Sequence, residues 1–209
     1  MSNNESILPP SLAERVRADL LPRVSRPAQY IGREVNQLVH DGDWERADVR
    51  LVLAFPDVYE IGMSHLGCQI LYWLANHTPG VCAERSYLPC ADAAEVMRQQ
   101  AIPLFTWDTR QPASTADIFA VSLQYEMAFT GMLMLLDLAG IPLRAGERDD
   151  RHPLVLVGGP QADNPEPVAE FVDLVVIGDG EDSLAAILAL YKDLKAGGMR
   201  RRDMIDVMA

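Results

Sequence analysis

The chain has 209 residues, of which 49% are hydrophobic and 23% are charged, and its formal net charge is −12 at pH 7. This size and composition are typical of a globular protein with one substantial core. The negative charge argues against a nucleic-acid partner, because binding to a phosphate backbone needs clustered Lys and Arg.

The N-terminal sequence "MSNNESILPP" lacks the basic and then apolar pattern of a signal peptide. No apolar run approaches the roughly 20 residues that a membrane-spanning helix needs. We therefore expect a cytoplasmic protein without a membrane partner. The three cysteines, Cys68, Cys82 and Cys90, have no Cys-x-x-Cys spacing, which predicts reduced and mostly buried thiols.

Residues 1–47 are expected to form an N-terminal helical arm that packs on the main domain. The stretch "SLAERVRADLLPRV" has apolar residues at helical spacing, and Ser11 stands where an N-cap would be. The stretch "AQYIGREVNQLVH", residues 28–40, carries a second apolar stripe of Tyr30, Ile31, Val35 and Leu38.

From residue 49 on, short apolar runs alternate with helical segments. The predicted strands are Val49–Phe55, Ala83–Tyr87, Ile118–Ser122, Leu154–Gly158 and Leu174–Ile177. The predicted helices are Ser64–Asn76, Ala91–Gln100, Glu126–Ala139 and Glu181–Lys195. This alternation predicts an α/β domain over residues 48–197, with a doubly wound, mainly parallel five-stranded sheet. Residues 102–114 fit less well and are expected to be a peripheral extended segment or a loop on the ligand face.

Ligands of an open parallel sheet bind beyond the carboxyl ends of its strands. In this chain the loops at those ends are rich in glycine and polar residues: "PDVYEIGMSHLG", "SLQYEMAFTG", "GGPQADNPEP" and "GDGEDS". The pair Gly158 and Gly159 would let a flat ligand approach the backbone, although a tight turn before Pro160 explains it equally well.

Several common activities are disfavoured by the same loops. Neither a phosphate-binding G-x-x-x-x-G-K-[ST] loop nor a G-x-G-x-x-G turn after the first strand is present. A receiver domain needs a phospho-accepting Asp at the end of the third strand, where Ser122 stands. A G-x-S-x-G elbow is absent, and His65 is the one histidine in a ligand loop.

The loops resemble those of the cobalamin-binding domain. In that family a strand is followed by D-x-H-x-x-G, then by a loop with a serine, then by a Gly-Gly turn, and Asp57, Gly62, Ser122, Gly158 and Gly159 fall at comparable places. The resemblance implies that the histidine ligates cobalt and that the Gly-Gly turn lies against the nucleotide tail. Here Tyr59 replaces the histidine, and a phenol with an ordinary pKa of about 10 is a poor cobalt ligand.

The chain more closely resembles the cobalamin-binding-type domains that stand at the N-terminus of radical S-adenosylmethionine (radical SAM) enzymes. The resemblance rests on "GGPQADNPEPVAEFVDLVVIGDGEDSLAAIL", "PAQYIGREVNQ" and "FPDVYEIGMSHLGCQILY", and it covers roughly residues 25–195. It implies cobalamin as a possible cofactor of this domain. The partner would be a C-terminal radical SAM domain of the same polypeptide.

The C-x-x-x-C-x-x-C triad that holds the 4Fe-4S cluster of radical SAM enzymes is absent here. The resemblance therefore implies that the cluster and S-adenosylmethionine belong to a domain beyond Ala209, with residues 198–209 as the start of a linker. Taken alone, the chain is expected not to catalyse a radical reaction, and no catalytic or metal-ligating residue is assigned.

The predicted cofactor-binding residues have three roles. Some shape the first loop, some offer hydrogen bonds to a tail or an amide, and glycines provide room; they are Asp57, Tyr59, Gly62, Ser122, Gln124, Gly158, Gly159 and Gly180. Two further hypotheses stay open at this point. One is a degenerate fold used for substrate recognition or protein interaction without a cofactor, and the other is an independent enzyme that uses Asp57, Glu60 and His65.

Overall fold

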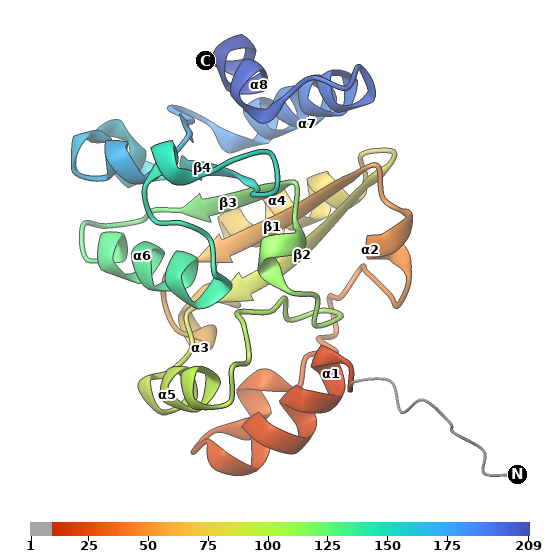
Figure 1. Ribbon diagram of the computed structural model, residues 1–209, viewed down its shortest axis with the longest axis vertical. Coiled ribbons are helices and arrows are strands. Elements are labelled where there is room, and N and C mark those ends of the chain that lie inside the picture. The colour runs from red at the N-terminus through yellow and green to blue at the C-terminus, as the bar shows by residue number, and fades with distance from the viewer. Residues whose placement is uncertain (1–9) are drawn as a thin grey trace, which may run out of the picture.

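Five parallel strands form the centre of the molecule in the computed structural model, which describes residues 10–209 (Figure 1). They pair in the order β2-β1-β3-β4-β5. This result confirms the predicted α/β fold with a doubly wound, flavodoxin-like parallel sheet, and three of the five predicted strands have the observed bounds. The strands are β1 Val49–Phe55, β2 Val81–Tyr87, β3 Ile118–Ser122, β4 Leu154–Gly158 and β5 Leu174–Val175.

Helices cover both faces of this sheet. The strand order runs one way from β1 to β2 and the other way from β3 onward, and right-handed crossovers then place helices on opposite faces. Helices α4 and α7 pack together on one face, and α5 and α6 pack on the other (Figure 1). The helices are α3 Tyr59–Gly62, α4 Leu66–Asn76, α5 Ala91–Gln99, α6 Ala128–Ala139, α7 Gly180–Ala196 and α8 Arg201–Met208.

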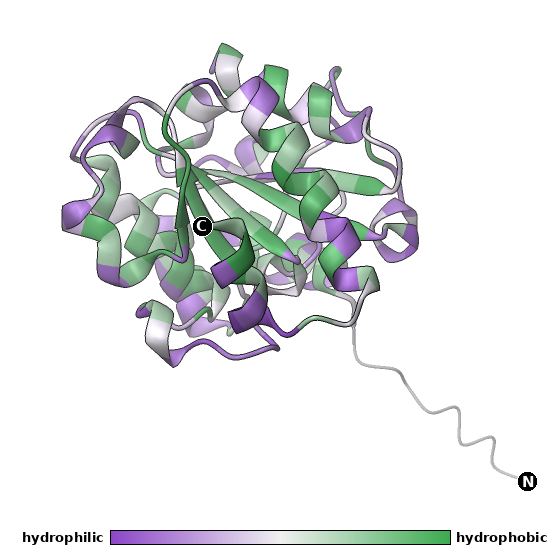
Figure 2. Ribbon diagram, turned by 90° about the horizontal axis from the view of Figure 1, so that it is seen from above, coloured by the Kyte–Doolittle hydropathy of each residue, from purple (hydrophilic) through white to green (hydrophobic). Residues whose placement is uncertain are grey.

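Strands β1, β3 and β4 are mostly apolar on both sides because helices cover both faces of the sheet. Figure 2 shows the hydrophobic strands enclosed between the helices. Val49, Leu51 and Val52 of β1 are fully buried. Between β4 and β5 two 3-10 turns, Pro160–Asp163 and Glu166–Phe171, stand where the other crossovers have an α-helix.

The first helix of the N-terminal arm forms as predicted. Ser11 caps α1, Leu12–Arg15, and shares a reciprocal capping box with Glu14. The helix continues as a π-helical turn over Val16–Leu20 and a 3-10 turn over Leu21–Arg23. Val16 and Leu20 are fully buried, so this part of the arm adds to the core.

The second apolar stripe of the arm does not form a helix, so that part of the prediction is wrong. A 3-10 turn, Pro27–Tyr30, is followed by irregular chain up to the short helix α2, Asp43–Arg46. Gly32 and Arg33 have φ values of 69° and 63°, which a right-handed helix cannot contain. Val35 is fully exposed as a result.

Residues 102–114 lie along the outer edge of β2, as a peripheral extended segment. Trp107 N donates to Arg85 O at 2.7 Å, and Arg85 N donates to an Asp108 carboxylate oxygen at 3.0 Å. The Asn76 side chain both donates to and accepts from the backbone of Ala83, each at 3.0 Å. These contacts occupy hydrogen-bonding groups that an edge strand would otherwise offer to another chain.

A buried ion pair fastens this segment to the rest of the molecule. Arg85 and Asp108 are 2.6 Å apart, and their side chains are 3% and 1% exposed. Burial opposes the charge of Arg85, but hydrogen bonds and charge from Asp108 outweigh it and raise its pKa. Arg85 also donates to Asn36 of the arm at 2.9 Å and lies over the Tyr72 ring of α4. One residue pair thus joins β2, α4, the edge segment and the arm.

A second buried carboxylate holds α8 against the body of the domain. Asp173 accepts from Val155 N at 2.7 Å and pairs with Arg148 at 3.0 Å and with Arg201 of α8. Met204 of the same helix is buried. The expected linker over 198–209 therefore contains a packed helix, and its role as a boundary stays a prediction.

No helix within residues 10–209 is long and apolar enough to cross a lipid bilayer.

We predict that Asp108→Ala lowers the free energy of unfolding by about 3–5 kcal/mol, because it leaves the Arg85 charge buried without a partner. Urea denaturation followed by circular dichroism measures this loss. The matched control is Asp137→Ala, which removes an ion pair with Arg98 whose side chains are 55% and 52% exposed. That change is expected to cost less than about 1 kcal/mol. Equal losses in the two variants would contradict the role given to Asp108.

Candidate functional site

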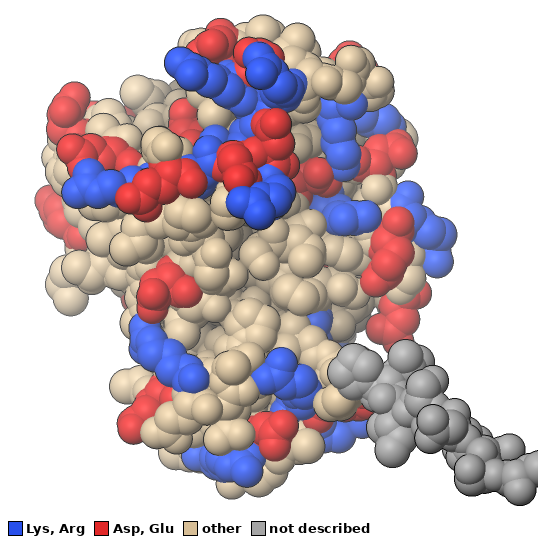
Figure 3. Space-filling model, viewed as in Figure 1, with Lys and Arg blue, Asp and Glu red and all other residues tan. Residues whose placement is uncertain are grey.

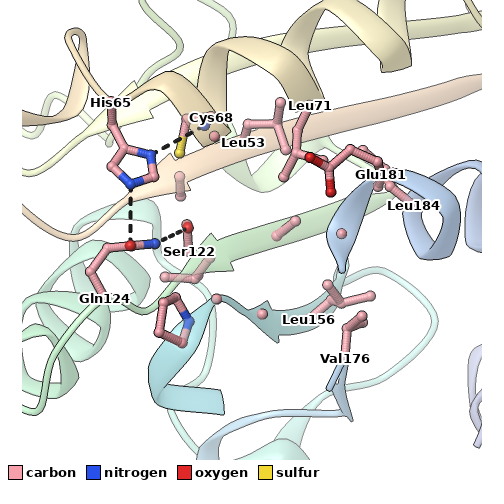
Figure 4. A pocket seen from close by; sticks show the side chains of 18 of the residues that line it. Leu53, His65, Cys68, Leu71, Ser122, Gln124, Leu156, Val176, Glu181 and Leu184 are labelled. Atoms are coloured by element: carbon pink, nitrogen blue, oxygen red, sulfur yellow. Dashed lines mark hydrogen bonds between the residues drawn. The ribbon is translucent and has the colours of Figure 1, made fainter. Parts of the chain in front are cut away.

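A cavity of about 280 Å³ lies between the sheet and helices α4 and α7 (Figure 4). Its floor is formed by β1, β3 and β4 near their carboxyl ends, through Leu53, Ala120 and Leu156. Leu71 of α4 and Leu184 of α7 form part of the opposite wall. The cavity spans β1 and β3, where the strand order reverses, which is the position where open α/β sheets bind ligands.

The cavity exists because side chains become smaller toward the carboxyl edge of the sheet. On this face β3 ends in Ser122 and β4 ends in Gly158, and these two residues are paired in register. The first residue of α7 is Gly180, and a Cβ there would lie 3.4 Å from a methyl group of Leu71. The small residues at this edge leave a space between the sheet and the two helices.

A row of hydrogen-bonded polar side chains forms one side of the cavity (Figure 4). His65 caps α4, and its Nδ1 accepts from Cys68 N at 3.2 Å, so the ring proton resides on Nε2. That Nε2 donates to Gln124 Oε1 at 3.1 Å, and Gln124 Nε2 donates to Ser122 Oγ at 2.7 Å. The bonds fix the orientation of the Gln124 amide at the cavity wall.

The Cys68 thiol lies in the same wall and is poorly ionised. Burial raises its pKa to about 11, and a hydrogen bond with Ser122 offsets part of that effect. A thiol in this state is a weak nucleophile and behaves as a small hydrophobic group.

The Gly-Gly turn has two different glycines. Gly159 has a φ of 97°, and a Cβ there would lie 2.6 Å from Leu123 O and 3.1 Å from Gln124 Nε2. This position needs glycine so that the loop after β4 can approach the loop after β3. Gly158 has strand geometry, and the nearest atom to a Cβ there would be 3.8 Å away, on Val176. A side chain at Gly158 would enter the cavity without straining the backbone.

The structure brings five of the eight predicted site residues together and leaves three elsewhere. The residues that line the cavity are Ser122, Gln124, Gly158, Gly159 and Gly180. Asp57, Tyr59 and Gly62 are outside the lining. Whether the five bind a cofactor stays a prediction.

The three remaining residues stabilise the first loop instead. Asp57 accepts from Val58 N at 2.7 Å and from the Tyr125 hydroxyl. Gly62 lies against Tyr87 so closely that a Cβ would be 2.4 Å from the ring. Tyr59 packs edge-on to Tyr87, with ring centroids 5.6 Å apart, and its hydroxyl donates to Glu34 of the arm.

Tyr59 is not available as a metal ligand. Burial and then the Glu34 carboxylate raise its pKa to about 12, so the phenol keeps its proton at neutral pH. Within residues 10–209 no group of three His, Cys, Asp or Glu side chains is placed to hold a metal ion.

The sequence-based site omitted the residues that the helices contribute. Cys68 and Leu71 lie three positions apart on α4, and Leu184 and Ile187 do the same on α7. That spacing was the available signal, because residues three apart on a helix share one face. Glu181, at the exposed start of α7, also borders the cavity. In the sequence, His65 was noted only because it lies in a ligand loop, and its bonds with Gln124 and Cys68 were not predicted.

The chain belongs to the family of N-terminal domains of radical SAM proteins, whose model matches residues 67–209. Such a domain is associated with a radical SAM catalytic domain, which uses S-adenosylmethionine and an iron–sulfur cluster. The matched range includes Cys68, Ser122, Gln124 and both glycine loops. It begins after His65 and after Asp57, Tyr59 and Gly62. A search of curated proteins found no match to the chain.

We predict that Gly159→Ala lowers the free energy of unfolding by about 1–3 kcal/mol, because alanine is strained at this φ and its Cβ would meet the Leu123 carbonyl. The control is Gly180→Ala, whose Cβ would lie 3.4 Å from a Leu71 methyl group, an ordinary contact. Thermal unfolding is expected to change little for the control and clearly for Gly159→Ala. A Gly159→Ala protein as stable as wild type would show that the loop does not depend on this turn.

We also predict that iodoacetamide labels Cys68 slowly at pH 8. With a pKa of about 11, roughly one thiol in a thousand is ionised at that pH, and the rate should rise about tenfold per pH unit up to pH 11. Peptide mass spectrometry resolves Cys68 from the other two cysteines. Labelling at pH 8 as fast as that of the denatured chain would contradict the buried environment described here.

Proposed function

We propose that the chain is a binding module for a corrinoid, and that the cavity takes the heterocyclic base at the end of the nucleotide tail. The observation that carries this proposal is the position and character of the cavity. It is mostly apolar, it opens at the carboxyl edge of the sheet, and it lies where the strand order reverses. In the associated protein, the corrinoid would then be presented toward the radical SAM domain.

The size of the cavity suits the tail and not the macrocycle. Its volume of about 280 Å³ is close to the lower end of the roughly 300–1,000 Å³ of small-molecule sites. A flat bicyclic base would lie between Leu71 and the sheet, with the Ser122 hydroxyl and the Gln124 amide within reach of its nitrogen atoms. The corrin ring would remain outside, over the loops, where Gly158 and Gly159 allow a close approach to the backbone.

The residues of this chain would hold the corrinoid without binding its cobalt. Tyr59 is protonated and hydrogen-bonded to Glu34, so this position does not supply a ligand. When bound, the corrinoid would supply alkyl-transfer or radical chemistry of its own. The contribution of the chain is to anchor the tail and to orient the ring.

A second candidate is a docking domain without a cofactor, and one observation favours it. Large apolar side chains are exposed on the segments that follow β1, β3 and β5: Ile61 at 48%, Leu66 at 68%, Met127 at 81% and Ile177 at 65%. Exposed apolar side chains of this size are typical of a protein interaction site when they form one patch. On the other hand, Tyr125 and Phe129 do not line the cavity, so aromatic rings do not fill it.

The independent-enzyme hypothesis gains no support, because its three residues face different partners. Asp57 bonds to Tyr125, Glu60 pairs with Arg26 at 2.7 Å, and His65 bonds to Gln124. A shared reaction centre would need these groups to converge.

The test compares hydroxocobalamin with cobinamide, which has the corrin ring but no nucleotide tail. We predict that the chain retains hydroxocobalamin on gel filtration, seen in the visible spectrum, and that cobinamide binds at least about tenfold more weakly. Gly158→Val should abolish retention, because the new side chain fills the cavity from a strand position that accepts β-branched residues. Gly146→Val is the matched control, since nothing lies within 4 Å of a Cβ at that surface position.

Equal affinity for the two corrinoids, or full retention by Gly158→Val, would show that the cavity is not the tail site. Failure of both corrinoids to bind the wild-type chain would favour the docking domain.

A further inference from the structure

The outer surface of helix α4 is apolar at every exposed position. The helix covers one face of the sheet beside α7, so its other side is turned outward (Figure 1). Its exposed residues are Leu66 at 68%, Ile70 at 36% and Trp73 at 52%. Residues at these spacings share one face of a helix. The His77 ring stacks on Trp73, with centroids 3.9 Å apart, and extends the stripe beyond the last turn.

Helix α7 carries a second apolar surface next to this stripe. Between Asp182 and Lys192 its exposed residues are all apolar: Ala185, Ala186, Ala189 and Leu190. Because three of these four side chains are small, the backbone of a partner can come close to α7. Together, the exposed apolar residues of α4 and α7 form what we call the α4/α7 surface.

The helices on the opposite face of the sheet are different. Exposed positions of α5 and α6 are mostly polar: Glu95, Arg98, Gln99, Thr130 and Asp137. Figure 3 views the molecule from the side of α6 and shows basic and acidic side chains interspersed there. A surface helix normally turns polar residues to the solvent. The α4/α7 surface is therefore the side of the molecule whose helices lack a polar outer face.

Basic residues are absent from the chain segments that build this surface. Residues 51–84 and 152–191, which include α4 and most of α7, contain no Lys or Arg. The first basic residues of α7 are Lys192 and Lys195, near its far end, and both are paired with carboxylates. The surface thus presents no free positive charge from its own helices.

Acidic residues border the same surface at the start of α7. Asp179, Glu181 and Asp182 are exposed, and within residues 10–209 none of them forms an ion pair. Asp179 precedes the first residue of the helix, but its side chain makes no capping hydrogen bond. These acids adjoin α4, because a Cβ at Gly180 would lie 3.4 Å from Leu71.

This charge pattern decides between possible occupants. A second copy of the chain would bring the same unpaired acids to the interface, and like charges facing each other are unfavourable. An anionic lipid surface attracts Lys and Arg, which these helices do not offer. A partner with an apolar stripe flanked by basic side chains would bury Trp73 and neutralise the acids at once.

We propose that the α4/α7 surface is a docking site for an amphipathic helix of another polypeptide, with Lys or Arg beside its apolar face. Two helices packed side by side offer a groove in which a third helix can lie. Trp73 is the expected anchor, since tryptophan is enriched among the residues that dominate binding energy. Leu66, Ile70 and Trp73 do not line the cavity, so the docking site is independent of corrinoid binding.

The test uses Trp73 as its own reporter. The other two tryptophans, Trp44 and Trp107, are only 3% and 2% exposed, so acrylamide quenches chiefly Trp73. The probe is the amphipathic peptide LKKLLKLLKKLLKL, titrated into the 209-residue chain. We expect saturable binding, an emission shift to shorter wavelength and weaker acrylamide quenching. The peptide LEELLELLEELLEL, which has the same apolar pattern and the opposite charge, should leave the emission unchanged.

Two variants of equal charge locate the site. Ile70→Lys places a cation within the stripe and should lower the affinity for the lysine peptide at least about tenfold. Thr130→Lys adds the same charge on α6, on the opposite face of the sheet, and should stay within about twofold of wild type. Circular dichroism checks that both variants are folded.

Equal losses in the two variants, or equal binding of the two peptides, would overturn the docking site. A chain that dimerises on gel filtration without peptide, with Trp73 already protected from acrylamide, would assign the surface to a second copy and would also overturn the proposal. Neither result would affect the retention of hydroxocobalamin, which depends on the cavity.

Discussion

The parallel pairing of Ser122 with Gly158 is the constraint on which the site depends. Parallel strands bring their carboxyl ends to one edge of the sheet. Because Ser122 and Gly158 are small and lie side by side there, this edge carries little side-chain volume. Helix α4 packs on β2 and on α7, and the edge beneath the two helices has no large side chain to fill the gap. The cavity is therefore a consequence of strand register and not of any single loop.

The same edge is divided between two environments. On one side, small and aliphatic residues leave space beside a short row of hydrogen bonds. On the other side, Tyr59, Tyr87 and Gly62 are packed tightly, and the arm closes over them through Glu34. Tyr59 is thus structural in this chain. The space for a ligand lies on the open side.

Most of the fold could be predicted from the sequence, because buried parallel strands leave a strong signal. The runs at Val49–Phe55 and Ile118–Ser122 are mostly apolar and each follows an aspartate, and their bounds match the structure. The helix predicted from the apolar stripe at residues 28–40 is absent, because apolar spacing does not reveal the positive φ of Gly32 and Arg33. The part of the cavity lining that comes from the glycine-rich loops could be predicted, because such loops are recognisable in a sequence. Cys68 and Leu71 line the cavity because of the way α4 is rotated against the sheet. The residues of the loops do not indicate this rotation.

The His65 ring has a further consequence. One nitrogen accepts from the start of α4 and the other donates to the loop after β3, so one ring satisfies both neighbours at once. Both contacts meet where the start of α4 lies against the loop after β3, so this part of the cavity wall is joined through a single side chain.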